Sequence, residues 1–172
     1  MALNSYLRLK GRQQGDIKGS VTQKGRENRI AVIAFSHEIA SPRDAASGQA
    51  IGKRRHGPLV ITKELDRSSP LLRAALVANE IITSLTLDFF SPQKAGTGTG
   101  TEVNDFTITL ANASIASVRM TTPNNKVPEL SKLATYEEIA FAYQKITWTW
   151  VNGASRRPTI GNSRCRWAAA GR

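Results

Sequence analysis

The chain has 172 residues, a hydrophobic fraction of 40%, a charged fraction of 22% and a formal net charge of +11. This length is typical of one domain with a sizeable core, and no apolar run approaches the ~20 residues that span a bilayer. The opening MALNSYLRLKG lacks the continuous apolar segment of a signal peptide, and the single cysteine, Cys165, excludes an internal disulfide. We therefore expect a protein that is made and folded in the cytoplasm, without membrane insertion.

Alternation of polar and apolar residues predicts strands in the first part of the chain. In SYLRLKG, residues 5–11, leucines alternate with polar residues. After a polar stretch, RIAVIAFSHEIAS, residues 29–41, predicts one long strand, and LVITKEL, residues 59–65, predicts another. One face of the long strand carries larger side chains, namely Ile33, Phe35, His37 and Ile39. The other face carries Val32, Ala34 and Ser36.

The segment SPLLRAALVA breaks the two-residue period and predicts one amphipathic helix, over about residues 70–79. Ser69 is a suitable N-cap, and Pro70 fits the first helical position, where its missing N–H is not needed. The apolar stripe of this helix comprises Leu71, Leu72, Ala75, Leu76 and Ala78.

Three further alternating segments, 82–90, 106–120 and 138–150, predict that the rest of the chain is β structure. In the second and third segments the parity of the apolar positions changes midway, after Leu110 and after Tyr143. Such a change indicates an extra, bulged residue, and bulges bend sheets. We therefore predict a mainly β fold, a small β-barrel or sandwich with one short helix. Its long strand edges are expected to be covered by neighbouring copies.

No motif in the sequence predicts catalysis, a cofactor or a metal. GTGTGT, residues 96–101, lacks the G-K-[ST] ending of a phosphate-binding loop and precedes a strand rather than a helix. His37 and His56 lack a third metal ligand at suitable spacing, because Cys165 lies in the C-terminal tail. His37 is expected to be a core histidine bonded to backbone, and the G-x-S-x-G nucleophile motif is absent from the sequence. Acidic residues beside turns and strand ends are expected to be solvated: Asp44, Glu64 and Asp66.

The segment SPRDAASGQAIGKRRHGP, residues 41–58, is the least ordinary part of the sequence. A connection of this length is usually functional or disordered. Its basic residues are not interleaved with the aromatic side chains on which single-strand binders stack bases. Three interpretations remain open from composition: docking onto another protein, disorder, and nucleic-acid binding. The prolines near both ends favour docking, since they stiffen a projecting loop and lower the entropy lost on binding.

Several motifs, in order along the chain, resemble one known family. SHEIASPRDAASGQAIGKRRHGPLVITKELDRSSPLL is similar to the central signature of Hcp, the hemolysin-coregulated protein of bacterial type VI secretion systems. MALNSYLRLKG, MTTPNNKVPEL and YEEIAFAYQKITWTW are also similar to the family pattern. The resemblance covers residues 1–152.

This resemblance implies a phage-tail-tube-like β-barrel with one helix, in which residues 41–58 form a long protruding loop. It implies hexameric rings that stack into the inner tube, a contractile sheath, a VgrG-type tip protein and effector proteins in the lumen. It further implies secretion through the apparatus without a signal peptide, and neither enzymatic activity nor a specific nucleic-acid partner. The residues expected at the subunit interface are Ser41, Pro42, Arg43, Asp44, Lys53, Arg54 and His56.

Residues 154–172 depart from the family pattern, in which the chain ends shortly after the Trp-Thr-Trp strand. They contain five arginines and no acidic residue. We expect them to form a disordered tail after an Hcp-like domain of residues 1–153, because they offer little to bury. The alternatives for the tail are an electrostatic contact with an acidic partner and a sequence altered relative to the family ending. For the whole chain, the alternative to a tube subunit is a basic β-barrel that binds nucleic acid through its charge.

Overall fold

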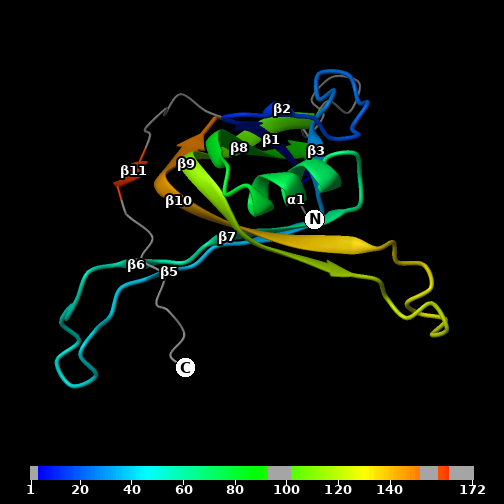
Figure 1. The fold of residues 1–172 in the computed structure, drawn as a ribbon. Helices are drawn as coiled ribbons and strands as arrows, with labels where there is room; N and C mark the ends of the chain where they lie inside the picture. Colours follow the sequence, from blue (N-terminus) through cyan, green and yellow to red (C-terminus); the bar gives the residue numbers. More distant parts are fainter. Residues whose placement is uncertain (1–3, 93–101, 152–158, 163–172) are drawn as a thin grey trace.

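A computed structural model describes residues 4–92, 102–151 and 159–162 (Figure 1). These residues are mostly β, with one short helix, α1 Ser69–Val77, so the predicted fold class is confirmed. No helix in the described ranges is long and apolar enough to cross a membrane. The strands are β1 Asn4–Gly11, β2 Gly15–Ile17, β3 Ile30–Val32, β4 Ala34–Ser36, β5 Ile39–Ala40, β6 Arg55–His56, β7 Leu59–Glu64, β8 Ile81–Pro92, β9 Glu102–Thr121, β10 Tyr136–Trp150 and β11 Thr159–Asn162.

One antiparallel sheet holds nine of these strands, in the order β2-β1-β8-β9-β10-β7-β4, while β5 and β6 form a separate ribbon. β3 also pairs with β1, and β11 with β10. The short segment 30–36 contains both β3 and β4, so its first half pairs with β1 and its second half with β7. It therefore connects the two ends of the sheet, but β3 and β4 are separate short strands and do not continue one ladder, so the fold is sandwich-like rather than a closed barrel.

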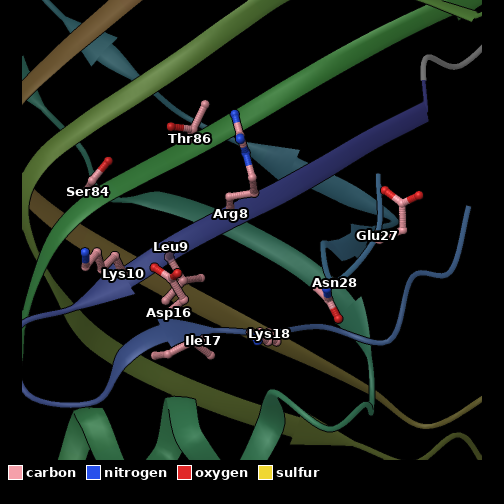
Figure 2. Close-up of a pocket in the computed structure, with 10 residues that line it drawn as sticks. All are labelled: Arg8, Leu9, Lys10, Asp16, Ile17, Lys18, Glu27, Asn28, Ser84 and Thr86. Carbon is pink, nitrogen blue, oxygen red and sulfur yellow. The ribbon is translucent and has the colours of Figure 1, made fainter. Parts of the chain in front are cut away.

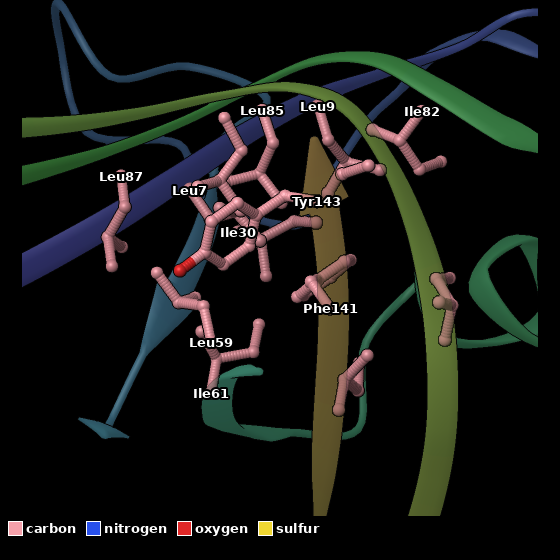
Figure 3. Close-up of a cluster of buried hydrophobic side chains, with 14 of the residues drawn as sticks. Leu7, Leu9, Ile30, Leu59, Ile61, Ile82, Leu85, Leu87, Phe141 and Tyr143 are labelled. Atoms are coloured by element: carbon pink, nitrogen blue, oxygen red, sulfur yellow. The ribbon is translucent and has the colours of Figure 1, made fainter. Parts of the chain in front are cut away.

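The core lies between the inner faces of these strands, and α1 packs against β9 (Figure 3). Successive side chains of a strand point to opposite faces, which explains the alternating burial of β1 and β7. Each large apolar side chain that is fully buried contributes roughly 1.5–3 kcal/mol relative to an exposed one. Those with no exposed area include Leu7, Leu59, Ile61, Leu72, Ile82, Leu85, Leu87, Leu110, Ile139, Phe141 and Ile146.

The parity changes predicted for β9 and β10 are confirmed, and β8, for which regular alternation was predicted, has a third change at the same level. Each strand has two consecutive outward residues there. Because all three carry the extra residue, their mutual register is kept, whereas the register with β1 shifts between Lys10 and Gly11. Asn112 adopts a φ of 49° at this level, and its amide donates to Gln144 Oε1 at 3.2 Å. The inward register partners are Ile82, Ala113 and Tyr143 on one side of the level and Leu85, Leu110 and Ile146 on the other.

The helix begins one residue earlier than predicted, because Ser68 rather than Ser69 is the N-cap. The Ser69 hydroxyl instead joins a buried polar cluster. Lys63 Nζ lies 2.8 Å from Glu137 Oε1 and 3.0 Å from Ser69 Oγ, and both charged side chains are fully buried. Asp66, which was expected to be solvated, forms an ion pair with Lys63 at 2.9 Å. This cluster fixes the start of α1 to β7 and β10.

The long strand predicted for residues 29–41 is wrong in its continuity, since the structure divides it into β3, β4 and β5. The face with the larger side chains is not the core face: Ile33 and Phe35 have 60% and 42% of their surface exposed, whereas Ile30 and Val32 are buried. The segment pairs in turn with β1, β7 and β6. The same face of a strand stays turned toward the core only as long as the strand keeps the same neighbours in the sheet, and this segment changes neighbours twice.

Candidate functional site

The most prominent surface feature is the arm, residues 41–58, which projects from the sandwich (Figure 1). Its stem is the ribbon of β5 and β6. Further out, the Ile51 N–H donates to Pro42 O at 3.0 Å, and Arg43 pairs with Ala50 across the arm. The two legs are thus hydrogen-bonded to each other at several levels, so the arm is an ordered ribbon, contrary to the disordered alternative.

Asp44 organises the tip of the arm. Its carboxylate accepts hydrogen bonds from the Ala46 N–H at 3.1 Å and the Ser47 hydroxyl at 2.8 Å. The Ala46 amide, and after it the Ser47 hydroxyl, lower the pKa of Asp44 below its ordinary value. Gly48 has a φ of 69°, a left-handed conformation that glycine adopts without strain. Asp44 therefore shapes the tip, and its carboxylate is engaged within the arm.

The structure distributes the seven predicted interface residues along the arm rather than in one patch. Pro42, Asp44 and His56 are half-buried, whereas the others are exposed. Within the described residues, the side chains of Lys53 and Arg54 form no ion pair. The outgoing leg and tip hold Ser41, Pro42, Arg43 and Asp44, and the returning leg and stem hold Lys53, Arg54 and His56.

A cluster of rings lies where the arm joins the sandwich. His37 Nε2 is 2.6 Å from the Tyr143 hydroxyl, and His56 Nδ1 is 3.4 Å from the same oxygen. The expectation that His37 bonds to backbone is therefore wrong, since this partner is a side chain of β10. Desolvation, followed by repulsion from His56, lowers the pKa of His37; desolvation, followed by repulsion from Arg54, lowers the pKa of His56. Local sequence could not reveal this cluster, because its members are far apart in the chain.

An open cavity of about 470 Å³ lies on the outer side of β1 and β8 (Figure 2). Its lining mixes bases and acids, so it is polar without a strong single charge. Ser84 and Thr86 line it, but no hydrogen bond in the described residues joins either hydroxyl to a histidine or carboxylate. A nucleophile activated by a neighbouring base is therefore not formed there. The charged residues of the lining are Arg8, Lys10, Asp16, Lys18 and Glu27.

Large apolar side chains are exposed at the outer parts of the molecule. On the arm, Ile51 has 67% of its surface exposed. The loop of the β9–β10 hairpin, residues 122–135, projects in a different direction from the arm (Figure 1). Apolar residues at projecting positions are typical of surfaces that another protein covers. The exposed apolar residues of the hairpin loop are Val127, Leu130 and Leu133.

Comparison with known proteins identifies the family. The family model described as "Type VI secretion system effector, Hcp" matches residues 6–150. The chain belongs to the Hcp family. A curated relative, the "Major exported protein" of Pseudomonas aeruginosa, is 36% identical over 176 residues, covering 94% of this chain and 100% of the relative.

Solved Hcp structures have the same fold. A mutant of Hcp1 from the E. coli EAEC 042 pathovar is 31% identical with a TM-score of 0.77, covering 96% of this chain and 100% of that one. The secreted protein Hcp3 of Pseudomonas aeruginosa is 27% identical with a TM-score of 0.72, covering 95% and 99%. A crystal structure of a further Hcp protein, at 24% identity and a TM-score of 0.81 over 97% and 100%, supports the fold alone. This Hcp is therefore a β-rich protein of the type VI secretion system, as its motifs predicted.

One described strand of this Hcp lies inside the tail that was expected to be disordered. β11 pairs with residues 145–148 of β10. These residues follow Phe141, the last residue of β10 that pairs with β7. The expectations for residues 154–158 and 163–172, including Cys165, and for the GTGTGT segment fall outside the described residues.

Proposed function

We propose that this Hcp is a subunit of the type VI inner tube, and that six copies close into a ring. In this proposal the rings stack into a tube that carries effector proteins in its lumen. The tube assembles in the cytoplasm inside a contractile sheath and leaves the cell with a VgrG-type tip protein, without a signal peptide. The observation that carries the proposal is the ordered, projecting arm in a chain that belongs to this family.

The arm has the physical character of a docking element. Its legs are already hydrogen-bonded to each other, so little conformational entropy is lost when it binds. Lys53 and Arg54 expose charge that no acidic group within the described chain neutralises, and Ile51 adds an exposed apolar side chain to the same leg. A combination of apolar contact and peripheral charge is typical of protein–protein interfaces.

The position of the arm is compatible with a head-to-tail ring. The arm projects well beyond the sandwich, so its receiving surface on a second copy is a different part of the chain (Figure 1). Such a head-to-tail contact repeats from copy to copy, and it gives a closed ring when the rotation between neighbours closes. The exposed side chains of Ile33 and Phe35 on the sandwich provide apolar surface for neighbouring copies to cover.

The proposal assigns no catalytic step to the protein. The described part of the chain holds no group of three histidine, cysteine or carboxylate side chains that could bind a metal ion. The buried Lys63 and Glu137 are engaged with each other. In this proposal the molecule acts through its surfaces alone.

Reversing the charge of the arm tests its part in assembly. The variant Lys53→Glu with Arg54→Glu leaves the hydrogen bonds of the tip intact, unlike a change at Asp44. We expect it to fold normally but to lose rings, measured by light scattering on a sizing column with negative-stain images of the peak. The matched control is Arg12→Glu with Lys24→Glu, the same charge change at exposed positions away from the arm.

Six-membered rings in the wild type and the control, together with their loss in the arm variant, would support the proposal. If rings persist in the arm variant, Lys53 and Arg54 are not part of the ring interface. A wild type that stays monomeric at all concentrations would contradict the tube function. A chain ending at Gly153 would then show whether the tail prevents assembly.

A further inference from the structure

The only two histidines of the chain meet at one tyrosine hydroxyl where the arm begins. His37 directly precedes the outgoing leg, and His56 lies in β6 on the returning leg. Tyr143 belongs to β10 of the sandwich and has only 3% of its surface exposed. Both legs of the arm are thus connected to the rigid part of the molecule through one phenol oxygen, at 2.6 Å and 3.4 Å.

The protonation state of the two rings decides how well this arrangement holds. The Tyr143 hydroxyl has a single proton, which it can donate to a neutral imidazole nitrogen. When both imidazoles are protonated, both become donors, and the hydroxyl can only accept from them. The ring centroids of His37 and His56 are 6.5 Å apart, so two positive charges then face each other at close range.

The surroundings add positive rather than negative charge to the pair. The charged residues nearest in sequence on the arm legs are Glu38, Arg54 and Arg55, and Lys145 follows Tyr143 on β10. Among these, Arg54 lowers the pKa of His56, and within the described residues no carboxylate is a cause of the shift of either histidine. β4, which leads into this region, carries no charged residue.

We propose that His37, His56 and Tyr143 form a proton-operated clamp that holds the arm against the sandwich when the histidines are neutral and releases it when they are protonated. The pKa of each histidine lies below its ordinary value of 6.5 in the folded protein. The two histidines therefore stabilise the attached arm fully above pH 6.5. This stabilisation is lost as the pH falls through the lower pKa values that they have in the folded protein. The clamp stabilises the arm at neutral pH and weakens in acid.

The consequence for assembly rests on the proposed function. If the arm docks onto a neighbouring copy, the clamp fixes the direction in which it projects, and mild acid then loosens rings or stacks. The clamp itself can be tested on the protein in any oligomeric state, because hydrogen exchange reports on the stem directly. The Gly57 N–H donates to Glu38 O at 2.9 Å in that stem and is protected only while the legs stay paired.

The test is hydrogen exchange of the full chain by mass spectrometry at about pH 7.5 and about pH 5, on either side of the ordinary histidine pKa, with times scaled for the intrinsic rate. We expect peptides covering residues 37–58 to lose protection by roughly 50- to 100-fold in acid, the effect of two unit charges about 6.5 Å apart near a protein surface. Peptides of β8 serve as the internal control and should not change. The double variant His37→Gln with His56→Gln keeps polar side chains but cannot titrate, so its arm should exchange equally at both pH values.

A third variant, Tyr143→Phe, keeps the ring in the core and removes the shared hydroxyl. We expect its arm to be less protected already at neutral pH. Equal scaled exchange of the wild-type arm at both pH values would overturn the clamp, and so would an acid-induced loss of the same size in the glutamine variant. A wild type that forms no rings but shows the acid response would leave the clamp standing and contradict the tube function, so the two failures are distinguishable.

Discussion

Replacing Glu137 by glutamine is a direct test of the buried polar cluster beneath α1. Glu137 and Lys63 are register partners on β10 and β7 and have no exposed side-chain area. The carboxylate also accepts from Ser69 Oγ at 2.7 Å and from Arg73 Nη2 at 3.0 Å. Its removal leaves the buried ammonium of Lys63 without its best partner, and the new amide group faces cationic donors.

The loss of unfolding free energy expected for Glu137→Gln depends on which partners of Lys63 remain. Breaking a buried ion pair from one side costs about 3–5 kcal/mol. Asp66 still lies 2.9 Å from Lys63 Nζ and compensates part of the charge, so we expect the lower end, about 3 kcal/mol. For a chain of this size that lowers Tm by roughly 6–12 °C. The assay is urea and thermal denaturation at one fixed protein concentration, because assembly would otherwise contribute.

Two controls make the result interpretable. Glu138→Gln is the same chemical change one position along the strand, on the other face, and should alter Tm little. The double variant Lys63→Met with Glu137→Leu removes both charges and should recover most of the lost stability. A loss below about 1 kcal/mol for Glu137→Gln, the value of an exposed ion pair, would refute the reasoning.

Other changes probe separate parts of the molecule. Leu72→Ala removes a fully buried side chain of α1 and should lower the unfolding free energy by about 2–5 kcal/mol in urea titrations; no change would mean that the helix does not close the core. The pKa of Glu80 is lowered from 4.5, chiefly by the Gln14 amide, so its stabilising contribution is present above pH 4.5 and is lost in acid. The difference in Tm between wild type and Glu80→Gln should therefore narrow below pH 4.5, and a constant difference would contradict this. A chain ending at Gly153 should show faster hydrogen exchange in residues 145–148, which β11 covers, and unchanged exchange would argue against that pairing.

The parts of the fold that depend on local pattern could be predicted from the sequence. The strict alternation in β1 and the position of α1 follow from side chains a few residues apart. The parity changes in β9 and β10 were visible because each strand keeps its own period on both sides of the change. The boundaries of the arm were visible as a polar, glycine-rich break between apolar strands.

The parts that depend on distant partners could not be predicted. The alternation places Lys63 on the same inward face of β7 as Leu59 and Ile61, and only the arrival of Glu137, 74 residues later, explains how its charge is accommodated there. His37 finds Tyr143 across 106 residues. The face of residues 29–36 that turns inward is set by two different neighbouring strands rather than by its own apolar side chains. The assignment of the arm residues to a subunit interface stays a prediction, because it concerns a second copy.

The shared level of extra residues in β8, β9 and β10 restricts how the length of this protein can vary. Removing one residue from a single strand there would leave half of that strand with its side chains inverted relative to both neighbours. Only a matched deletion in all three segments would restore the inward rows, although the segments are separated by long stretches of sequence. We therefore expect an insertion or deletion in one of these strands to prevent correct folding. Matched changes in all three strands should be tolerated.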